Sequence, residues 1–271
     1  MQRRHFLKVM ISGLVLGCFP KRVFAGVKNY DDHVKDYLLK MRSFNKAHKD
    51  DIYLDRDEYL LLISSVKRLK RLQETVGHGN FSLLNFDDAI KIASNYSQVG
   101  PFTKSELAFL EMIFYQDGAF YGFLDEKPLK NITDRIPRRN IIKAPYTGNY
   151  LYRGRSFETY KKIKQDVGEK VILTSGVRSI IKQFMLFLNK VCKNNGNLSL
   201  ASRSLAPPGY SFHGIGDFDV GQAGLGIANF TSRFTDTEVY RRLRELDYIQ
   251  LRYREDNLLG VRFEPWHIKV I

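Results

Sequence analysis

The stretch YSFHGIGDFDVG, residues 210–221, places one histidine and two aspartates in a run that glycines interrupt. It contains few helix-forming residues, and a plain strand or turn would need only bulk and alternation. A metal site, a catalytic pair or an ordinary polar loop would each explain the grouping of His213, Asp217 and Asp219. These interpretations make different demands on the other residues of the chain, which therefore help to decide between them.

The first 25 residues have the form of an export signal, with paired arginines, an apolar run and a small-residue end at Ala25. The arginine pair resembles twin-arginine signals, whose pathway carries folded proteins. The uncharged run over residues 9–20 is far shorter than the ~20 residues of a membrane-spanning helix. We therefore expect cleavage after Ala25 and a periplasmic or cell-envelope location. Lipid attachment at Cys18 is the alternative.

The chain is basic, with a formal net charge of +14. Removal of the signal, which carries five basic residues and no acidic one, would leave about +9. Such a charge suits an anionic partner, for example a cell-wall surface. Nucleic acid is an unsuitable target, because no nucleic-acid-binding motif is present and the protein is predicted to be exported. Only Cys192 would remain after cleavage, so the mature chain has no internal disulfide and depends on its hydrophobic core.

The segment 26–145 is predicted to be mainly helical. Residues 55–77 repeat apolar side chains at three- and four-residue spacing and end at a glycine. A second helix follows Thr103, which has Glu106 at the spacing of a capping box. The three prolines between 119 and 149 indicate an irregular connection, so we place a domain boundary near residue 145.

The segment 146–271 is predicted to mix helices with an antiparallel sheet. Helical patterns cover residues 156–168 and 179–196, a buried strand covers 170–176, and Thr235 with Glu238 predicts the start of a third helix. Alternation on both sides of EDN at 255–257 predicts a terminal hairpin. The fold class is therefore α+β.

Two of the histidines that remain after signal removal are candidates for chemistry. His213 and His267 lie in HGIGDFD and EPWH, each beside carboxylates, in the half that carries the predicted sheet. With one aspartate they make a three-ligand set that leaves zinc an open position, as catalytic sites do. The alternative is that His213 belongs to a polar loop and His267 to a strand, with no metal bound.

Three motifs in the last 125 or so residues together resemble the VanY-like zinc D-alanyl-D-alanine carboxypeptidases and D,D-peptidases, which share a fold with the hedgehog signalling domain. The motifs are SGVRS at 175–179 with Gln183, the Ser211–His213 stretch that ends in aspartate, and the EPWH of 264–267. They occur in the family's order. The resemblance implies an α+β domain of the hedgehog/D,D-peptidase type over residues 146–271, with zinc as cofactor.

The resemblance also implies zinc ligands, although one spacing differs. It assigns His213, Asp219 and His267 as the ligands. The family usually has six residues between its first histidine and its aspartate, whereas five separate His213 from Asp219. We place the deletion in the glycine turn, which keeps Asp219 as ligand, and Asp217 is the competing choice.

The remaining motif residues receive roles around the metal. Glu264 is predicted to be the general base and acid, although residues 264 and 267 would point to opposite faces of a straight strand. Arg178 is predicted to bind an oxyanion or a substrate carboxylate, with a structural ion pair as the alternative. Four further residues are candidates for contact with substrate or for support of the site: Ser211, Ser179, Gln183 and Tyr210.

The export signal, the candidate ligands and the resemblance together imply an exported zinc metallopeptidase that hydrolyses D-alanyl-D-alanine-type bonds in peptidoglycan stem peptides. A rival from another class is an inactive zinc-containing protein that binds cell wall, and the presence of Glu264 argues against it. An endopeptidase that cuts peptidoglycan crosslinks is a rival among enzymes. The helical segment would bind the wall or cover the site.

Overall fold

The computed structural model describes residues 30–270. The predicted export signal and Cys18 lie outside this range. The chain divides into two units between residues 36 and 37, within α2 (Tyr30–Arg42), and the second unit begins at Tyr37. All other helices and strands of the described residues belong to the second unit. Within the described residues, no helix has both the length and the apolar character to cross a bilayer.

Four helices form the N-terminal part of the second unit: α3 (Arg56–Val76), α4 (His78–Phe81), α5 (Phe86–Asn95) and α6 (Lys104–Tyr115). Local signals determine where they begin. The Thr103 side chain accepts a hydrogen bond from the Glu106 amide, and Glu106 bonds back to Thr103, so the predicted capping box is present. Asp55 and Glu58 form a second box at the start of α3.

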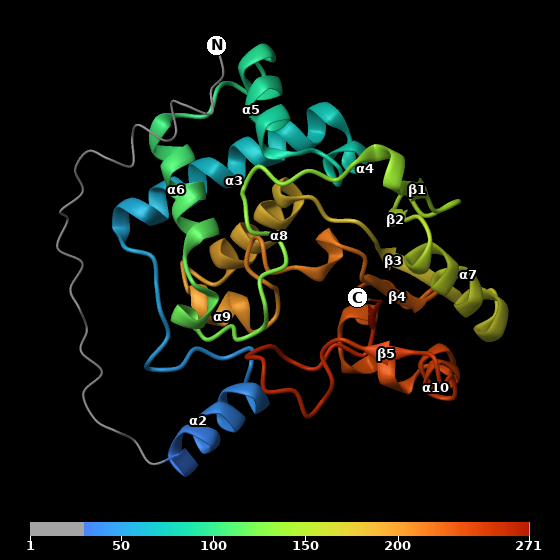
Figure 1. The fold of residues 1–271 in the computed structure, drawn as a ribbon. Coiled ribbons are helices and arrows are strands. Elements are labelled where there is room, and N and C mark those ends of the chain that lie inside the picture. The colour runs from blue at the N-terminus through green and yellow to red at the C-terminus, as the bar shows by residue number, and fades with distance from the viewer. Residues whose placement is uncertain (1–29, 271) are drawn as a thin grey trace. The chain divides into compact units, whose positions relative to one another are not determined.

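The largest hydrophobic cluster joins the two halves of the sequence. Helix α8 (Ile180–Lys193) packs against α3 and α5, and Figure 1 shows α8 beside α3. Phe184, Phe187 and Leu188 of α8 lie in one buried cluster with Leu69 of α3 and Phe114 of α6. The N-terminal helices are therefore part of the same core that holds α8, whose first turn follows the SGVRS motif.

Short elements make up the connection before the sheet. They are η1 (Gly118–Tyr121), η2 (Arg138–Asn140) and the antiparallel strands β1 (Ile141–Lys143) and β2 (Tyr150–Tyr152). The predicted irregular connection contains these elements. Segment 117–129 reaches the C-terminal loops, because Leu124 N donates to Leu259 O and Leu129 N donates to Gly209 O.

A four-stranded antiparallel sheet carries the C-terminal half, in the order β3 (Val171–Ser175), β4 (Phe218–Gln222), β6 (His267–Lys269) and β5 (Gln250–Leu251). Helices α7 (Arg155–Val167) and α10 (Glu238–Arg244) pack against the sheet's apolar side chains. Among these side chains are Phe218, Val220 and Ile268, which alternate with the polar residues of the other face. The predicted α+β class is confirmed.

Two details of the predicted elements were wrong. The cap of α10 is Thr237, whose side chain accepts from Tyr240 N, whereas Thr235 lies in a preceding 3-10 turn, η5 (Ser232–Asp236). The terminal hairpin is reduced to a short pairing of β5 with β6, and residues 252–266 between them contain no strand. The remaining short elements are α9 (Leu198–Ser202), η3 (Phe212–Gly214) and η4 (Gly226–Phe230).

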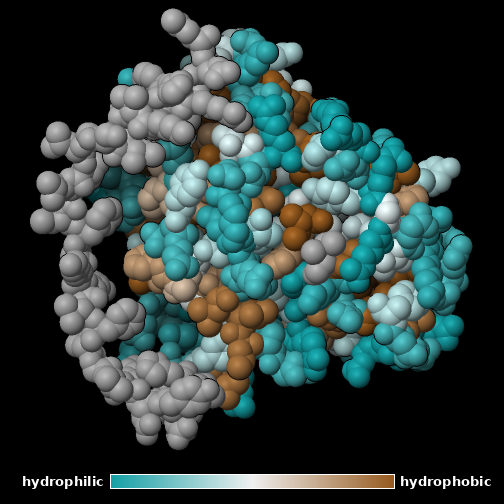
Figure 2. Space-filling model, viewed as in Figure 1, coloured by the Kyte–Doolittle hydropathy of each residue, from teal (hydrophilic) through white to brown (hydrophobic). Residues whose placement is uncertain are grey.

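The face of the molecule drawn in Figure 2 is mostly hydrophilic, and apolar residues reach the surface in separate places. Several large apolar side chains are exposed on the described part of the chain, among them Leu60, Tyr146, Ile227 and Leu258. Scattered apolar side chains of this kind are normal on soluble proteins.

Candidate metal centre

Strand register brings two of the predicted ligands face to face. Asp219 of β4 is the direct partner of His267 at the start of β6, and Ser175 of β3 is the partner of Asp219 on the other side. Because successive strand residues point to opposite faces, Asp219 lies on the face opposite its apolar neighbours Phe218 and Val220. The site is thus built on the polar face of the sheet.

The predicted turn between His213 and the aspartates is present. The amides of residues 215, 216 and 217 all point to the carbonyl of Phe212, so the chain folds back before β4 begins. Gly216 has a φ of 149°, which favours glycine. Gly214 serves a different purpose, because a Cβ there would lie 2.7 Å from Leu129 Cδ1. This turn places His213 beside the strand that follows it.

His213, Asp219 and His267 meet in one buried cluster, with a ligand atom from each within 4.8 Å of the others. His213 Nε2 lies 3.2 Å from Asp219 Oδ1, and His267 Nδ1 lies 3.6 Å from the same oxygen. The side chains are between 1% and 4% exposed. The two imidazole rings stand 4.7 Å apart at 62°. The three side chains therefore converge on one point.

The ring nitrogens that face away from this point have partners of their own. His213 Nδ1 lies 2.8 Å from the carbonyl oxygen of Gly176, and His267 Nε2 lies 3.2 Å from Asp217 Oδ2. Backbone carbonyls and carboxylates are the usual outer partners that orient metal-binding histidines. Gly176 is required here because a Cβ would overlap the Tyr150 carbonyl. The glycine of SGVRS therefore allows the close packing behind His213.

Unsatisfied buried atoms test whether these residues fit a metal. Among the described residues, His213 Nε2 and Asp219 Oδ1 are buried and make no hydrogen bond. Such groups are costly unless something binds them. Two imidazoles and one carboxylate are the donor set of catalytic zinc sites. The residues present therefore fit a zinc ion held by His213 Nε2, Asp219 and His267 Nδ1.

Charges in the site suit cation binding. Burial and the nearby Arg178 lower the pKa of His213, which favours the neutral imidazole that metals require. Burial alone would raise the pKa of Asp219, but His213 and Arg178 hold it well below its usual range. Burial alone would lower the pKa of His267, but hydrogen bonds with Asp217 and Glu264 raise it to about 9. Metal binding at His267 would displace a proton.

Glu264 lies beside the cluster because the chain turns before β6. The His267 amide donates to the Glu264 carbonyl across Pro265 and Trp266, so residues 264 and 267 are joined by a turn and not by a straight strand. Glu264 Oε2 lies 3.3 Å from His267 Nδ1. The side chain is 11% exposed. Because of this turn, the side chains of Glu264 and His267 lie on the same side, whereas a straight strand would point them to opposite faces.

Arginines hold both aspartates. Arg178 donates to Asp219 Oδ2 through Nη2 and to Ser175 Oγ through Nε at 2.9 Å. Arg252 donates to Asp217 Oδ2 at 2.7 Å. Asp217 also accepts from the Val270 amide at 2.8 Å. Asp219 thus lies in the cluster, whereas Asp217 lies behind His267.

The four remaining predicted residues surround the centre at different depths. Ser179 caps α8 by accepting from Lys182 N, and Gln183 bonds the Arg178 carbonyl and the Gly209 amide. The Tyr210 hydroxyl accepts from Gly118 N at 2.7 Å. These three side chains therefore support the loops of the site. The structure shows no hydrogen bond of the Ser211 hydroxyl within its described part.

Sequence reasoning missed the two arginines that follow β5. Arg252 bonds Asp217, and Arg262 lies with Nε 3.9 Å from Glu264 Oε1. Both stand in a segment where arginine alternates with apolar residues, a pattern that resembles any exposed strand. No sequence signal distinguishes them from surface charges.

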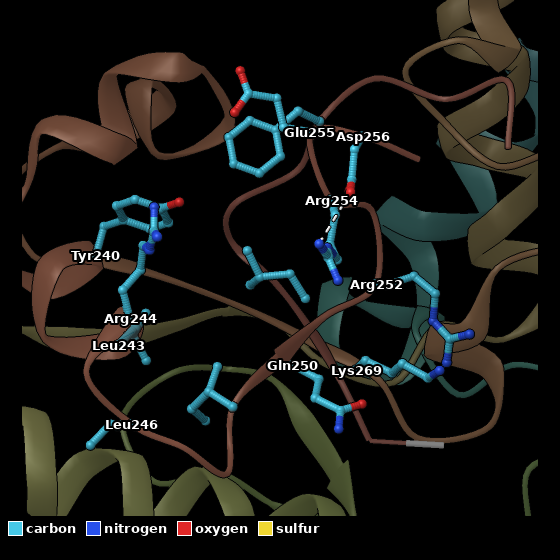
Figure 3. A pocket seen from close by; sticks show the side chains of 13 residues that line it. Tyr240, Leu243, Arg244, Leu246, Gln250, Arg252, Arg254, Glu255, Asp256 and Lys269 are labelled. Atoms are coloured by element: carbon cyan, nitrogen blue, oxygen red, sulfur yellow. Dashed lines mark hydrogen bonds and ion pairs between the residues drawn. The ribbon is translucent and has the colours of Figure 1, made fainter. Parts of the chain in front are cut away.

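A separate pocket, here called the edge pocket, lies beside edge strand β5 and has a volume of about 1020 Å³. Figure 3 shows Tyr240, Leu243 and Arg244 of α10 on one side and Gln250 and Lys269 of the sheet on the other. Its wall also includes Arg252, whose Nε is bonded to Asp217. None of the predicted ligands or Glu264 lines it.

Comparisons with known proteins agree with the motifs. Residues 154–271 match the sequence model of VanY, D-alanyl-D-alanine carboxypeptidase. No curated protein matches the chain. The C-terminal segment, which carries the candidate metal centre, is thus similar in sequence to the VanY D-alanyl-D-alanine carboxypeptidases.

Three solved structures are similar to parts of the chain. A mutant of the vancomycin resistance D,D-pentapeptidase VanY from a VanB-type cassette, in complex with Zn(II), is 24% identical with a TM-score of 0.40, covering 55% of this chain and 88% of that one. VanYB in complex with D-alanine-D-alanine is 27% identical with a TM-score of 0.34, and the match covers 49% of this chain and 83% of that one. The D,D-dipeptidase VanXYg in complex with a phosphinate analogue of D-Ala-D-Ala is 22% identical with a TM-score of 0.41, covering 55% and 58%.

Proposed function

We propose that this protein is an exported zinc metallopeptidase that hydrolyses D-alanyl-D-alanine-type bonds in peptidoglycan stem peptides. The observation that carries the proposal is the convergence of His213, Asp219 and His267 on one point, with the facing atoms of His213 and Asp219 buried and unbonded. The family match over residues 154–271 supplies the substrate class.

The proposed ligands leave room for catalysis. His213, Asp219 and His267 would hold zinc with three protein ligands, and the bound ion would supply Lewis-acid activation of the peptide carbonyl. Gly176 and Asp217 hold the two imidazoles by their other nitrogens, which keeps the facing nitrogens aimed at the ion.

Glu264 is the proposed proton carrier. Its Oε2 lies on the side of the ligand cluster, 3.3 Å from His267 Nδ1. From there it can accept a proton from the attacking water and donate it to the amine that leaves. Retention of this carboxylate beside the cluster favours an enzyme over an inactive wall-binding protein.

Arg178 is proposed to stabilise the developing oxyanion. Its guanidinium is already positioned by Ser175 and Asp219, and the side chain is 16% exposed. A fixed, partly buried cation of this kind lowers the energy of negative charge that appears during the reaction.

Export and the partner are proposed on the sequence. The twin-arginine-like signal would carry the folded protein to the periplasm or cell envelope, where stem peptides are present. The net charge of about +9 that remains after cleavage suits an anionic wall surface. The segment 26–145 is proposed to support or cover the site.

Elemental analysis and digestion of muropeptides test the proposal together. Gently purified mature protein is expected to carry about one zinc per chain. It is also expected to remove the terminal residue from pentapeptide muropeptides, as mass spectrometry would show. Protein that takes up no zinc, or zinc-loaded protein that leaves all stem peptides intact, would contradict the proposal.

A further inference from the structure

Arg262 differs from the other arginines that are largely buried. Four of those donate to a carboxylate within hydrogen-bond distance, in the pairs Arg68–Glu106, Arg178–Asp219, Arg203–Asp51 and Arg252–Asp217. Arg262, by contrast, pairs within residues 30–270 only with Glu264, whose Oε1 lies 3.9 Å from Nε. Its Nε is buried and makes no hydrogen bond within residues 30–270. A buried cation without a close anion is costly.

The guanidinium of Arg262 is nevertheless held firmly. The Trp266 and Phe44 rings lie 4.9 Å and 5.1 Å from it, and Nη2 donates to the Phe230 carbonyl at 3.1 Å. Burial lowers the pKa of Arg262, whereas Glu264 and Asp219 oppose this effect. The side chain is still 18% exposed. The guanidinium group of Arg262 is therefore held in a fixed position and is partly accessible to a substrate group.

Glu264 lies between Arg262 and the ligand cluster. Its Oε2 is 3.3 Å from His267 Nδ1, and its Oε1 is 3.9 Å from Arg262 Nε. The two oxygens of one carboxylate thus face a zinc ligand and a cation. Arg262 lies next to the proton carrier, on the side of Oε1.

Covalent geometry determines what would lie beside Glu264 in a carboxypeptidase reaction. Glu264 delivers its proton to the nitrogen of the leaving residue, so this nitrogen must come within hydrogen-bond distance of the carboxylate. In any amino acid the carboxylate carbon is ~2.5 Å from the amine nitrogen. The terminal carboxylate of the leaving residue would therefore lie near Glu264 and needs a cation to balance its charge.

We propose that Arg262 binds the free C-terminal carboxylate of the substrate and so makes the enzyme prefer chain ends to crosslinks. This inference rests on the proposed peptidase function and specifies the substrate of the same site. A planar guanidinium matches a carboxylate with two hydrogen bonds. Arg178 is less suited to this task, because its Nε and Nη2 are already bonded to Ser175 and Asp219.

Two peptides that differ only at the C-terminus provide the test. The wild-type, zinc-loaded protein is expected to cleave an N-acetylated peptide ending in D-Ala-D-Ala about 100-fold better in kcat/KM than its C-terminal amide, because the amide leaves the cation unpaired. Arg262→Gln should lose most of this preference, because KM for the peptide with the free carboxylate rises while kcat/KM for the peptide amide changes less than about threefold. Arg262→Lys should retain more of the preference than Arg262→Gln, since lysine keeps the positive charge.

The matched control is Arg244→Gln, which removes one positive charge from the exposed rim of the edge pocket. It is expected to keep the wild-type preference. Zinc content and melting temperature of each variant show whether the fold is intact. If folded Arg262→Gln protein loses kcat/KM equally on the peptide acid and the peptide amide, the inference is overturned, because Arg262 would then act through Glu264 or through packing.

Further outcomes separate this inference from the proposed function. If the wild type cleaves the peptide acid and the peptide amide equally well, Arg262 does not recognise the substrate carboxylate, but the protein is still a peptidase as proposed. If the wild type cleaves neither, the proposed function fails. Calorimetric titration of Glu264→Gln protein with both peptides then decides: tighter binding of the acid, lost when Arg262→Gln is added, supports the inference, and equal binding of both peptides refutes it.

Discussion

The metal centre and the edge pocket are opposite kinds of cavity on one small sheet. The edge pocket is large, about 1020 Å³, and on its exposed rim Arg254 donates to Asp256 at 3.1 Å (Figure 3). The candidate metal centre is a cluster of buried side chains, in which His213 Nε2 and Asp219 Oδ1 make no hydrogen bond within the described residues. The difference teaches that buried, unsatisfied polar atoms indicate chemistry better than volume does.

The largest effect is expected at Asp219. Asp219→Ala should abolish zinc binding, because it removes a ligand whose Oδ1 faces both histidines. Asp217→Ala is the matched control and should weaken zinc binding by at most ~10- to 100-fold, the usual cost of losing an outer partner. Zinc affinities are measured by competition with a chelator. The reverse order of affinities would assign Asp217 as ligand.

Glu264→Ala should have the next largest effect, on turnover alone. The variant keeps all three proposed ligands, so its zinc content is expected to equal that of the parent. Loss of the proton carrier should lower kcat by ~10²-fold or more. The ratio of kcat for the variant to kcat for the parent is measured with metal-loaded protein and a pentapeptide substrate. Turnover within a few-fold of the parent would place the general base on another residue.

A smaller loss is expected for Arg178→Lys. Lysine keeps the positive charge but cannot donate to Ser175 and Asp219 at once in the planar arrangement of the guanidinium. We expect kcat to fall about 10-fold or more while zinc affinity changes less. If Arg178→Lys and Arg178→Ala both retain full activity, the arginine has only a structural role.

The smallest effect is expected in the edge pocket. Arg254→Gln breaks an ion pair whose two side chains are 70% and 72% exposed. Exposed pairs contribute little, so the free energy of unfolding should fall by less than about 1 kcal/mol. Activity should stay within about twofold of the parent. A large loss of activity would show that the edge pocket takes part in substrate binding and would reverse the comparison.

Local sequence signals predicted the helices and the motif residues. Capping boxes at Thr103 and Asp55 place the first turns of α6 and α3, because the bonds involved span only three residues. The prediction failed where the deciding contacts are distant in sequence. Thr235 has the stronger local signal, with Glu238 at capping-box spacing, yet Thr237 caps α10 and Thr235 lies in η5.

The choice between the aspartates shows the same limit. Asp217 and Asp219 have the same parity along a strand, so alternation alone does not separate them. Pairing of Asp219 with His267, across 48 residues, brings Asp219 into the cluster, while Arg252 and the Val270 amide hold Asp217 behind it.

The sequence by itself determined the α+β class, the kinds of donor atom and the order of the motifs, since these depend on residue type and short spacing. Tertiary structure alone decided which donors converge, and which largely buried arginine of the described residues, Arg262, has no carboxylate within hydrogen-bond distance. The physical reason is that strand register and buried electrostatics arise from contacts between residues tens of positions apart. Local patterns carry no information on such distances.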